Sequence, residues 1–391
     1  MKSMRIALFA ASALLPFAAT QANAKTAVGS YNGLNWQAQS TVVGQTGTGT
    51  VASGGDPIYL ATAGKYRGTV GLLMDYGAGG RFVCSGSLSA NRTSIITAGH
   101  CVSDGFGTKG PNSVTAYFYN PDDNPAEPGV YSAMTPPTVT KVEIGRILVN
   151  PLYTGEVIDQ NDIAVLRLAG LAPDFAVGYD LYLGELTGLG FNVAGYGRRS
   201  TTGGDNGVTA PFGLGTGRLR QGDNRYDFAF GDADFGGFFT DRDANGENFF
   251  GTADIEFSYV SDFDNGRAAN DASCRLAVNG LGIAASDKYC NVGVGAREVG
   301  ISGGDSGGPG FVNGKLASVN SYGLSFGPAF GDFGGGLNSG FGEFSGYAPI
   351  FSSAAFVQGA IPEPATWALM IGGFGMVGAA SRRARRAALA A

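Results

Sequence analysis

A single histidine and a glycine-flanked serine are the residues of this chain best suited to catalysis. His100 is the only histidine among the 391 residues and lies in residues 97–101, which read TAGHC. Ser306 lies in residues 304–309, which read GDSGGP. A serine hydroxyl is a weak nucleophile and needs an adjacent base to take its proton. Because the chain offers one imidazole, we interpret His100 and Ser306 as a base and its nucleophile.

A carboxylate in an apolar run supplies a third candidate. Asp162 stands in residues 161–166, NDIAVL, where an aspartate by itself is often only a turn residue. The chain order, His100, then Asp162, then Ser306, is that of the chymotrypsin triad, in which the aspartate holds one imidazole tautomer and stabilises the imidazolium. At these three places the sequence resembles the trypsin/chymotrypsin family of serine proteases.

The chain order also argues against a second kind of serine hydrolase. Gly304, Ser306 and Gly308 fit the Gly-x-Ser-x-Gly elbow of the α/β-hydrolases. That fold needs its histidine after the serine, and no histidine follows position 100. A lipase or esterase of that fold is therefore not expected.

The resemblance implies roles for residues around the nucleophile. The backbone N–H groups of Gly304 and Ser306 would form the oxyanion hole, in which one donor contributes roughly 2.7–4 kcal/mol of transition-state stabilisation. Residues 320–323, NSYG, resemble the strand that forms a pocket wall and pairs with the substrate backbone. The substrate-binding residues on it would be Ser321, Tyr322 and Gly323.

The residue at the base of the specificity pocket indicates the preferred side chain. By the resemblance this residue is Gly300, six before Ser306, where trypsin-like members have an aspartate. Without that carboxylate, a buried Lys or Arg of a substrate would lack its partner. We therefore expect a preference for apolar or small side chains. Asp332, in the Gly-rich loop 327–346, would reverse this preference if it entered the pocket.

The four cysteines suit an oxidising compartment and allow three disulfide connectivities. The resemblance implies that Cys84 pairs with Cys101 beside the histidine, and that Cys274 pairs with Cys290 in a loop before the serine. The sequence has no Cys and His cluster of metal-ligand type, so a zinc mechanism is not supported. We expect no metal and no cofactor in the reaction.

Both ends of the chain resemble targeting signals. Residues 1–24 have the basic start, apolar core and A-x-A site of a secretory signal peptide, so we expect cleavage after Ala24. Residues 361–391 contain Pro-Glu-Pro, a short apolar run and an arginine cluster, and resemble the PEP-CTERM sorting signal of Gram-negative bacteria. This resemblance implies an exosortase-type processing enzyme as a partner. A plain C-terminal membrane anchor is the alternative.

The charge between these signals limits the class of partner. The two terminal segments hold six of the 26 basic residues and one of the 32 acidic residues, so the body carries a net charge of −11. An acidic surface argues against nucleic acid as a partner. It suits an exported protein that meets the membrane only through its C-terminal segment. We expect a secreted or cell-envelope protein.

The body has the residue pattern of an all-β protein. Short runs of Val, Ile, Leu, Tyr and Phe are separated by Gly, Asn, Asp and Ser turns. The resemblance implies two six-stranded antiparallel β-barrels of the chymotrypsin type with the active site in the cleft between them. We expect the protease domain at residues 66–360, the barrels at about 66–174 and 175–360, and a C-terminal helix at 352–357.

The segment before the first barrel fits the family pattern poorly. Residues 25–65 are rich in Gly, Thr and Ser, and we interpret them as a propeptide or an ordered arm. No Arg/Lys-Ile-Val-Gly-Gly activation site is present, and Ile58, at roughly the family's distance from Cys84, follows a proline. In many family members the freed amine pairs with the aspartate before the serine, here Asp305. The mode of maturation stays open.

The segment at about 199–272 is longer than the family fold needs, and we interpret it as an insertion. Residues 241–246 resemble the start of a calcium loop, but Thr252 stands where that loop needs a glutamate. We therefore favour a solvated acidic insertion. Calcium ligation is the alternative, with four further aspartates as possible sources of oxygen. These are Asp232, Asp234, Asp262 and Asp264.

Together these features predict an exported serine endopeptidase that acts through an acyl-enzyme. Ser306 attacks the peptide bond, His100 relays the proton and Asp162 orients the imidazole. The alternative, from another functional class, is a catalytically silent homologue that serves as a binding module in the cell envelope or exopolysaccharide.

Overall fold

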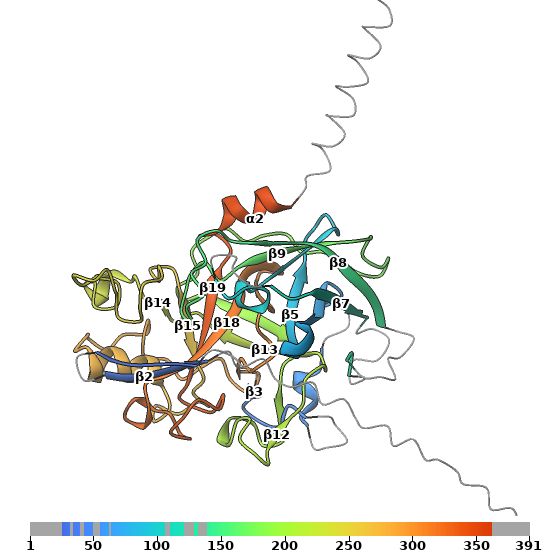
Figure 1. The fold of residues 1–391 in the computed structure, drawn as a ribbon. Coiled ribbons are helices and arrows are strands. Elements are labelled where there is room, and N and C mark those ends of the chain that lie inside the picture. The colour runs from blue at the N-terminus through green and yellow to red at the C-terminus, as the bar shows by residue number, and fades with distance from the viewer. Residues whose placement is uncertain are drawn as a thin grey trace, which may run out of the picture.

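The structure, a computed structural model, consists mainly of β-strands (Figure 1). It describes residues 26–31, 34–39, 43–49, 55–61, 64–105, 110–120, 129–131 and 139–361. The expected signal peptide and, apart from Ile361, the expected sorting segment lie outside the described residues. Among the described residues, none of the helices has the length and hydropathy that a membrane crossing requires.

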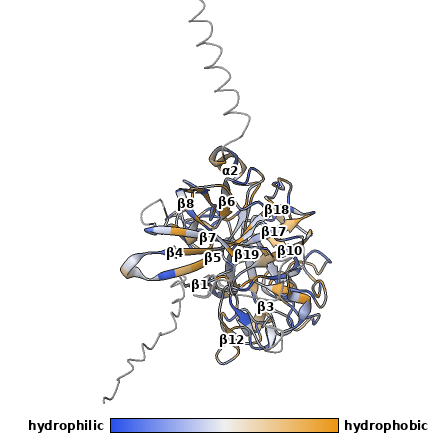
Figure 2. Cartoon of the chain, turned by 90° about the vertical axis from the view of Figure 1, so that its right-hand side faces the viewer, coloured by the Kyte–Doolittle hydropathy of each residue, from blue (hydrophilic) through white to orange (hydrophobic). Residues whose placement is uncertain are grey.

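Six antiparallel strands close the first barrel in the order β4-β5-β6-β9-β8-β7. Their bounds are β4 (Thr69–Asp75), β5 (Arg81–Leu88), β6 (Ser94–Thr97), β7 (Ser113–Tyr119), β8 (Val139–Val149) and β9 (Ala164–Leu168). β-Branched and large apolar residues favour such strands. Val70, Leu72 and Val165 are fully buried in its core, and Figure 2 shows hydrophobic colouring along β4 and β5. The predicted first barrel is confirmed.

The second half of the chain forms a curled half-barrel rather than a second closed barrel. Its sheet follows the order β13-β10-β17-β18-β19-β15-β14, with β2 attached to β18 and β1 attached to β2. These strands are β1 (Ala27–Tyr31), β2 (Leu34–Gln39), β10 (Gly190–Gly195), β13 (Arg220–Arg225), β14 (Phe228–Ala229), β15 (Tyr259–Asp262), β17 (Pro309–Val312), β18 (Lys315–Ser325) and β19 (Phe344–Pro349). The prediction of two closed six-stranded barrels is therefore confirmed only for the first.

Side chains of β13 and of the residues just after it bond to the backbone of β15 and of Val299 where the sheet stays open. The amide of Asn224 donates to the carbonyl oxygens of Asp262 at 2.8 Å and Val299 at 3.0 Å. The carboxylate of Asp227 accepts from the N–H of Asp262 at 2.8 Å. Side-chain groups thus satisfy backbone donors and acceptors that a closed barrel would satisfy through a strand ladder.

Short elements complete the fold. Two small sheets pair β3 (Val43–Gly44) with β16 (Val299–Gly300), and β11 (Arg199–Ser200) with β12 (Gly213–Leu214). The helices are α1 (Ala272–Cys274), which continues into a π-helical turn η7 (Arg275–Gly280), and α2 (Ala354–Ala360). The 3-10 turns are η2 (Pro57–Tyr59), η3 (Gly77–Gly79), η4 (Gly99–Cys101), η5 (Gly203–Asp205), η6 (Ala233–Phe235) and η8 (Pro328–Phe330). The expected C-terminal helix is present as α2.

The insertion has an aromatic core of its own. Phe235, Phe239 and Phe249 are buried in a cluster that also includes Trp36 of β2. In the loop that resembled a calcium site, the guanidinium of Arg242 donates to the carbonyl oxygens of Gly246, Thr252 and Ala253 and to the carboxylate of Asp254. The insertion that we expected to be solvated and acidic thus also has an apolar interior, and Arg242 binds carbonyl oxygens of the segment that resembled a calcium loop.

Candidate active site

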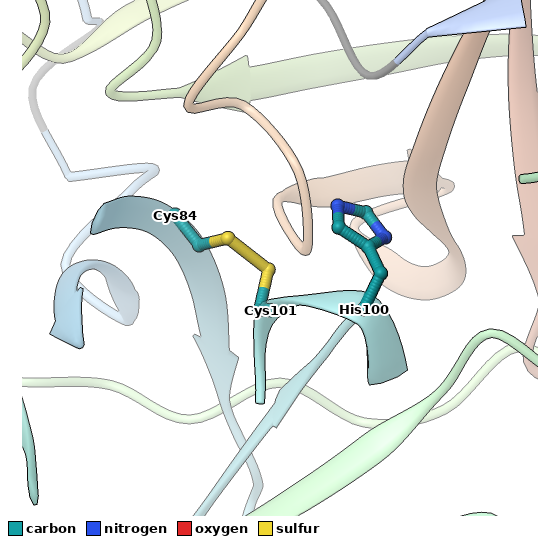
Figure 3. A group of neighbouring side chains, drawn as sticks. All are labelled: Cys84, His100 and Cys101. Atoms are coloured by element: carbon teal, nitrogen blue, oxygen red, sulfur yellow. A yellow bond between two sulfur atoms is a disulfide. The ribbon is translucent and has the colours of Figure 1, made fainter. Parts of the chain in front are cut away.

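His100 stands on a short turn that follows β6. A disulfide between Cys84 of β5 and Cys101 ties this turn to the first barrel (Figure 3). Gly99 lies so close to its neighbours that a Cβ there would sit 3.0 Å from the ring of Tyr153 and 3.1 Å from an oxygen of Asp162. A glycine therefore lets the turn approach the carboxylate closely.

The imidazole of His100 is bonded to Asp162. Its Nδ1 lies 2.7 Å from Oδ2 of Asp162, and the backbone N–H of His100 donates to Oδ1 at 2.8 Å. Asp162 is 1% exposed, whereas a quarter of the His100 side chain is exposed. The carboxylate thus fixes Nδ1 as the donor and leaves Nε2 as the basic nitrogen.

Ser306 is brought to the same place by contacts with the first barrel. The N–H of Ser85 donates to the carbonyl oxygen of Ser306 at 2.8 Å, and the hydroxyl of Ser85 donates to that of Gly304 at 2.8 Å. Gly307 has a φ of +80°, and a Cβ there would be 1.9 Å from Oγ1 of Thr97. The serine loop therefore lies against the end of β6, beside the turn that holds His100.

The backbone around the nucleophile offers unpaired donors. Gly304 and Ser306 are buried, and neither N–H donates a hydrogen bond within the part of the chain that the structure describes. Gly304 has a φ of +100°, a conformation that strongly favours glycine. Buried N–H groups are normally paired, so these two remain available to a hydrogen-bond acceptor, as the expected oxyanion hole requires.

One contact of the expected triad is not made. The hydroxyl of Ser306 forms no hydrogen bond with His100 or with any other residue in the described ranges. Such catalytic hydrogen bonds are often long in ligand-free enzymes and tighten when substrate binds. The structure thus brings His100 and Asp162 into contact and sets Ser306 near them.

Asp305, the expected partner of a freed amine, is buried and has no ion pair with a cationic side chain among the described residues. Its carboxylate accepts from the N–H groups of Gly197 at 2.9 Å and Ser302 at 3.2 Å, and burial raises its pKa well above the usual range. Ile58 lies within η2, where its N–H donates to Asp56 and its carbonyl oxygen accepts from Arg297. In this uncleaved chain Ile58 is therefore part of a helical turn.

The expected substrate-binding residues on β18 have three different environments. The hydroxyl of Ser321 donates to Oδ2 of Asp162 at 2.5 Å. Tyr322 points into the core, where its hydroxyl lies 2.6 Å from that of Ser258. Gly323 pairs with β19 on one side and with Gln39 of β2 on the other. Nothing in the sequence except the resemblance of residues 320–323 indicated the contact between Ser321 and Asp162.

An aromatic ring and a hydroxyl lie nearest to the side-chain position of Gly300. The nearest atoms to a Cβ built there belong to the ring of Phe263, at 3.2 Å, and the hydroxyl of Ser345, at 3.6 Å. The carboxylate of Asp332 accepts from the hydroxyl of Ser325 and from backbone N–H groups of its own loop. A cationic side chain placed beside Gly300 would find no carboxylate among the nearest atoms.

A metal site is not formed around the histidine. Cys84, His100 and Cys101 are the one group of three Cys, His, Asp or Glu residues in the described segments whose ligand atoms lie within 4.8 Å of one another. Both cysteines are held in the disulfide, and Nδ1 of His100 is bonded to Asp162. A metal ion needs deprotonated thiolates and a free imidazole nitrogen, so this group is not suited to one.

Comparison with known families adds to this geometry. A Trypsin family model matches residues 61–209, a range that includes His100 and Asp162 and ends before Ser306. The chain contains a trypsin-family domain. A second model, the PEP-CTERM protein-sorting motif, matches residues 360–386. No curated protein sequence matches the chain.

The two matches bear on activity and location in different ways. The trypsin-family domain suggests a serine peptidase with peptide substrates. The sorting motif implies exosortase processing and sorting to the cell surface in bacteria. The two expected disulfides, Cys84 with Cys101 and Cys274 with Cys290, are both present.

Proposed function

We propose that this protein is an exported serine endopeptidase with His100, Asp162 and Ser306 as its triad. The observation that carries this proposal is the His100–Asp162 pair, with Nδ1 and Oδ2 at 2.7 Å, beside a serine loop whose two flanking N–H groups are free. A base oriented by a buried carboxylate and a preformed oxyanion site are the parts that acyl transfer needs.

The reaction follows from the atoms involved. Oγ of Ser306 attacks the carbonyl carbon of the scissile peptide, and Nε2 of His100 takes the hydroxyl proton. The N–H groups of Gly304 and Ser306 stabilise the oxyanion that forms. His100 then gives its proton to the leaving amine, and a serine ester remains. Water, deprotonated by His100, hydrolyses the ester and restores Ser306.

The surroundings of Gly300 support a preference for apolar or small side chains. A ring and a hydroxyl, rather than a carboxylate, face this position. Substrates with Arg or Lys at the cleaved bond would bury a charge without a partner, and we expect them to be cleaved more slowly. The sorting motif supports a site of action outside the bacterial cytoplasm.

A fluorophosphonate probe tests this proposal directly. The purified body, residues 25–361, should gain the mass of one adduct, and Ser306→Ala should gain none. His100→Ala should retain Ser306 but label at least about a thousandfold more slowly, because the proton acceptor is lost. A folded protein that does not label, or one that labels equally after Ser306→Ala, would instead support the silent binding module.

A further inference from the structure

The edge of β18 nearest the triad is occupied by the chain's own N-terminal arm. β18 pairs with β19 on one side over residues 318–324. On its other side it pairs with β17 over residues 315–319, and this ladder ends where the N–H of Gly307 donates to the carbonyl oxygen of Asn320. β19 pairs with one side of Gly323 and Leu324. β2 therefore pairs with their other side, which β17 does not reach.

The direction of β2 points it towards the nucleophile. Its register with β18 is antiparallel, with Gln37 opposite Ser325, Ala38 opposite Leu324 and Gln39 opposite Gly323. Rising numbers in β2 therefore run along β18 towards Ser321, whose hydroxyl touches the triad carboxylate. An extended peptide that added to this edge as a strand would have to use the same backbone groups.

A second strand of the arm covers the specificity residue. Val43 of β3 pairs with Gly300, and the side chain of Val43 is fully buried. The pairing of β2 with β18 and the pairing of β3 with Gly300 are made by neighbouring segments of one arm. Gly323 on the strand edge and Gly300 at the expected pocket base thus both pair with strands of the same part of the chain.

The arm is held by an apolar face on β2. Leu34, Trp36 and Ala38 are buried and alternate with exposed Asn35 and Gln37. Trp36 packs edge-to-face against Phe250 of the insertion, with ring centroids 5.0 Å apart. The insertion therefore supplies a surface that keeps β2 on the edge of β18.

We propose that the N-terminal arm is a built-in competitor for the substrate edge. It holds the peptidase latent until residues 34–44 are displaced or cut away. This inference rests on the proposed function, since it assumes that peptides bind along β18. It predicts that small reagents reach Ser306 while extended peptides are excluded.

The test compares two readouts in the body of the protein, residues 25–361. One is the rate of Ser306 labelling by a small fluorophosphonate, which needs no strand pairing. The other is kcat/KM for a peptide with at least four residues before the cleaved bond. Trp36→Ala and Ala38→Glu should each raise peptide turnover at least about tenfold, because they weaken the packing of β2, and leave labelling within about threefold.

Asn35→Glu is the matched control, since it adds the same charge to an exposed position of β2. It should change neither readout. Thermal unfolding checks that each variant folds, and mass spectrometry after limited proteolysis should show earlier loss of the arm in Trp36→Ala and Ala38→Glu.

The outcomes separate two failures. Normal labelling with peptide turnover unchanged by folded Trp36→Ala and Ala38→Glu would overturn the arm proposal and leave the peptidase proposal standing. Folded proteins that neither label nor cleave would overturn the peptidase proposal, and the arm proposal with it.

Discussion

Asp162 is the residue on which the geometry of the site depends most. It accepts from the backbone and the ring of His100 and from the hydroxyl of Ser321, and it is 1% exposed. A carboxylate oxygen of Asp162 accepts from Nδ1 of His100, and this holds the imidazole in the tautomer whose Nε2 can take a proton. A substitution that keeps the shape of Asp162 but replaces a carboxylate oxygen with an N–H donor therefore tests the role of this residue.

We expect Asp162→Asn to lower kcat by about ten-thousandfold, because an amide can stabilise the wrong imidazole tautomer. Steady-state hydrolysis of a peptide, by protein whose N-terminal arm has been displaced or cut away, measures kcat. The thermal unfolding midpoint reports whether the variant is folded. Nearly normal kcat in folded Asp162→Asn would remove Asp162 from the proposed triad.

Ser321 is expected to be a positioning residue that acts through Asp162. Ser321→Ala removes a 2.5 Å hydrogen bond to a carboxylate, so we expect kcat to fall about tenfold or more with little change in KM. Ser318→Ala is the matched control, since it removes a buried hydroxyl of the same strand that bonds to Tyr226 instead. A rise in KM alone would mean that Ser321 binds substrate only.

At the scale of elements, one glutamate fastens the insertion to the first barrel. Glu156, in the loop between β8 and β9, accepts from the N–H and hydroxyl of Thr252 and from the N–H of Ala253. Together with Arg242 it fixes both ends of the loop that resembled a calcium site.

Glu156→Ala should loosen this loop without changing the chemistry of the triad. We expect amide hydrogen exchange at Thr252 and Ala253 to rise at least about tenfold, because these N–H groups lose their acceptor. Glu247→Ala, at an exposed glutamate of the same loop, is the control. Unchanged exchange in Glu156→Ala would mean that Arg242 alone holds the loop.

At the scale of the whole molecule, five carboxyl groups from four segments are buried in the second half of the chain. They are Asp227, Asp262, Asp264, Asp271 and Glu298. Burial raises the pKa of Asp271 to about 6, of Asp227 and Asp264 to about 7, of Glu298 to about 8, and of Asp262 well above its ordinary value. One oxygen of Asp264 has no hydrogen-bond partner within the described residues.

These groups should make the fold less stable as the pH rises. A carboxyl whose pKa is raised in the folded state keeps its proton there while the unfolded chain loses it, so its contribution to stability is complete below about pH 4 and is lost progressively up to its folded pKa. We therefore expect the free energy of unfolding to fall between pH 5 and about pH 8.

Chemical denaturation across this pH range measures the effect. Asp264→Asn should reduce the pH dependence by up to about 1.4 kcal/mol per pH unit below pH 7, because it removes one of the five buried carboxyl groups. Asp287→Asn, at an exposed aspartate within the Cys274–Cys290 loop, should leave the slope unchanged. Equal slopes in both variants would show that Asp264 ionises without cost to the fold.

Much of the candidate site follows from the sequence. His100, Asp162 and Ser306 stand in short local motifs, and local pattern predicts β-strands through the body of the chain. The family resemblance, rather than local pattern, implied the first barrel and the C-terminal helix. The disulfide pairing is similar, since three connectivities were open and the family resemblance favoured the one observed. The motifs and strands depend on near neighbours in the chain, for which residue type is informative.

Tertiary structure alone decided the rest. The pairing of β2 with β18 joins residues almost 300 positions apart, and its register is set by the packing of Trp36 against the insertion. In the open second sheet, the side chains of Asn224 and Asp227 bond to backbone groups of Asp262. The expected role of Ser321 depends on a contact with Asp162, which lies 159 residues away in the sequence. Local sequence patterns do not predict these pairings. Each pairing depends on which of several segments, distant in the sequence, forms the more stable hydrogen bonds and buries the more apolar area.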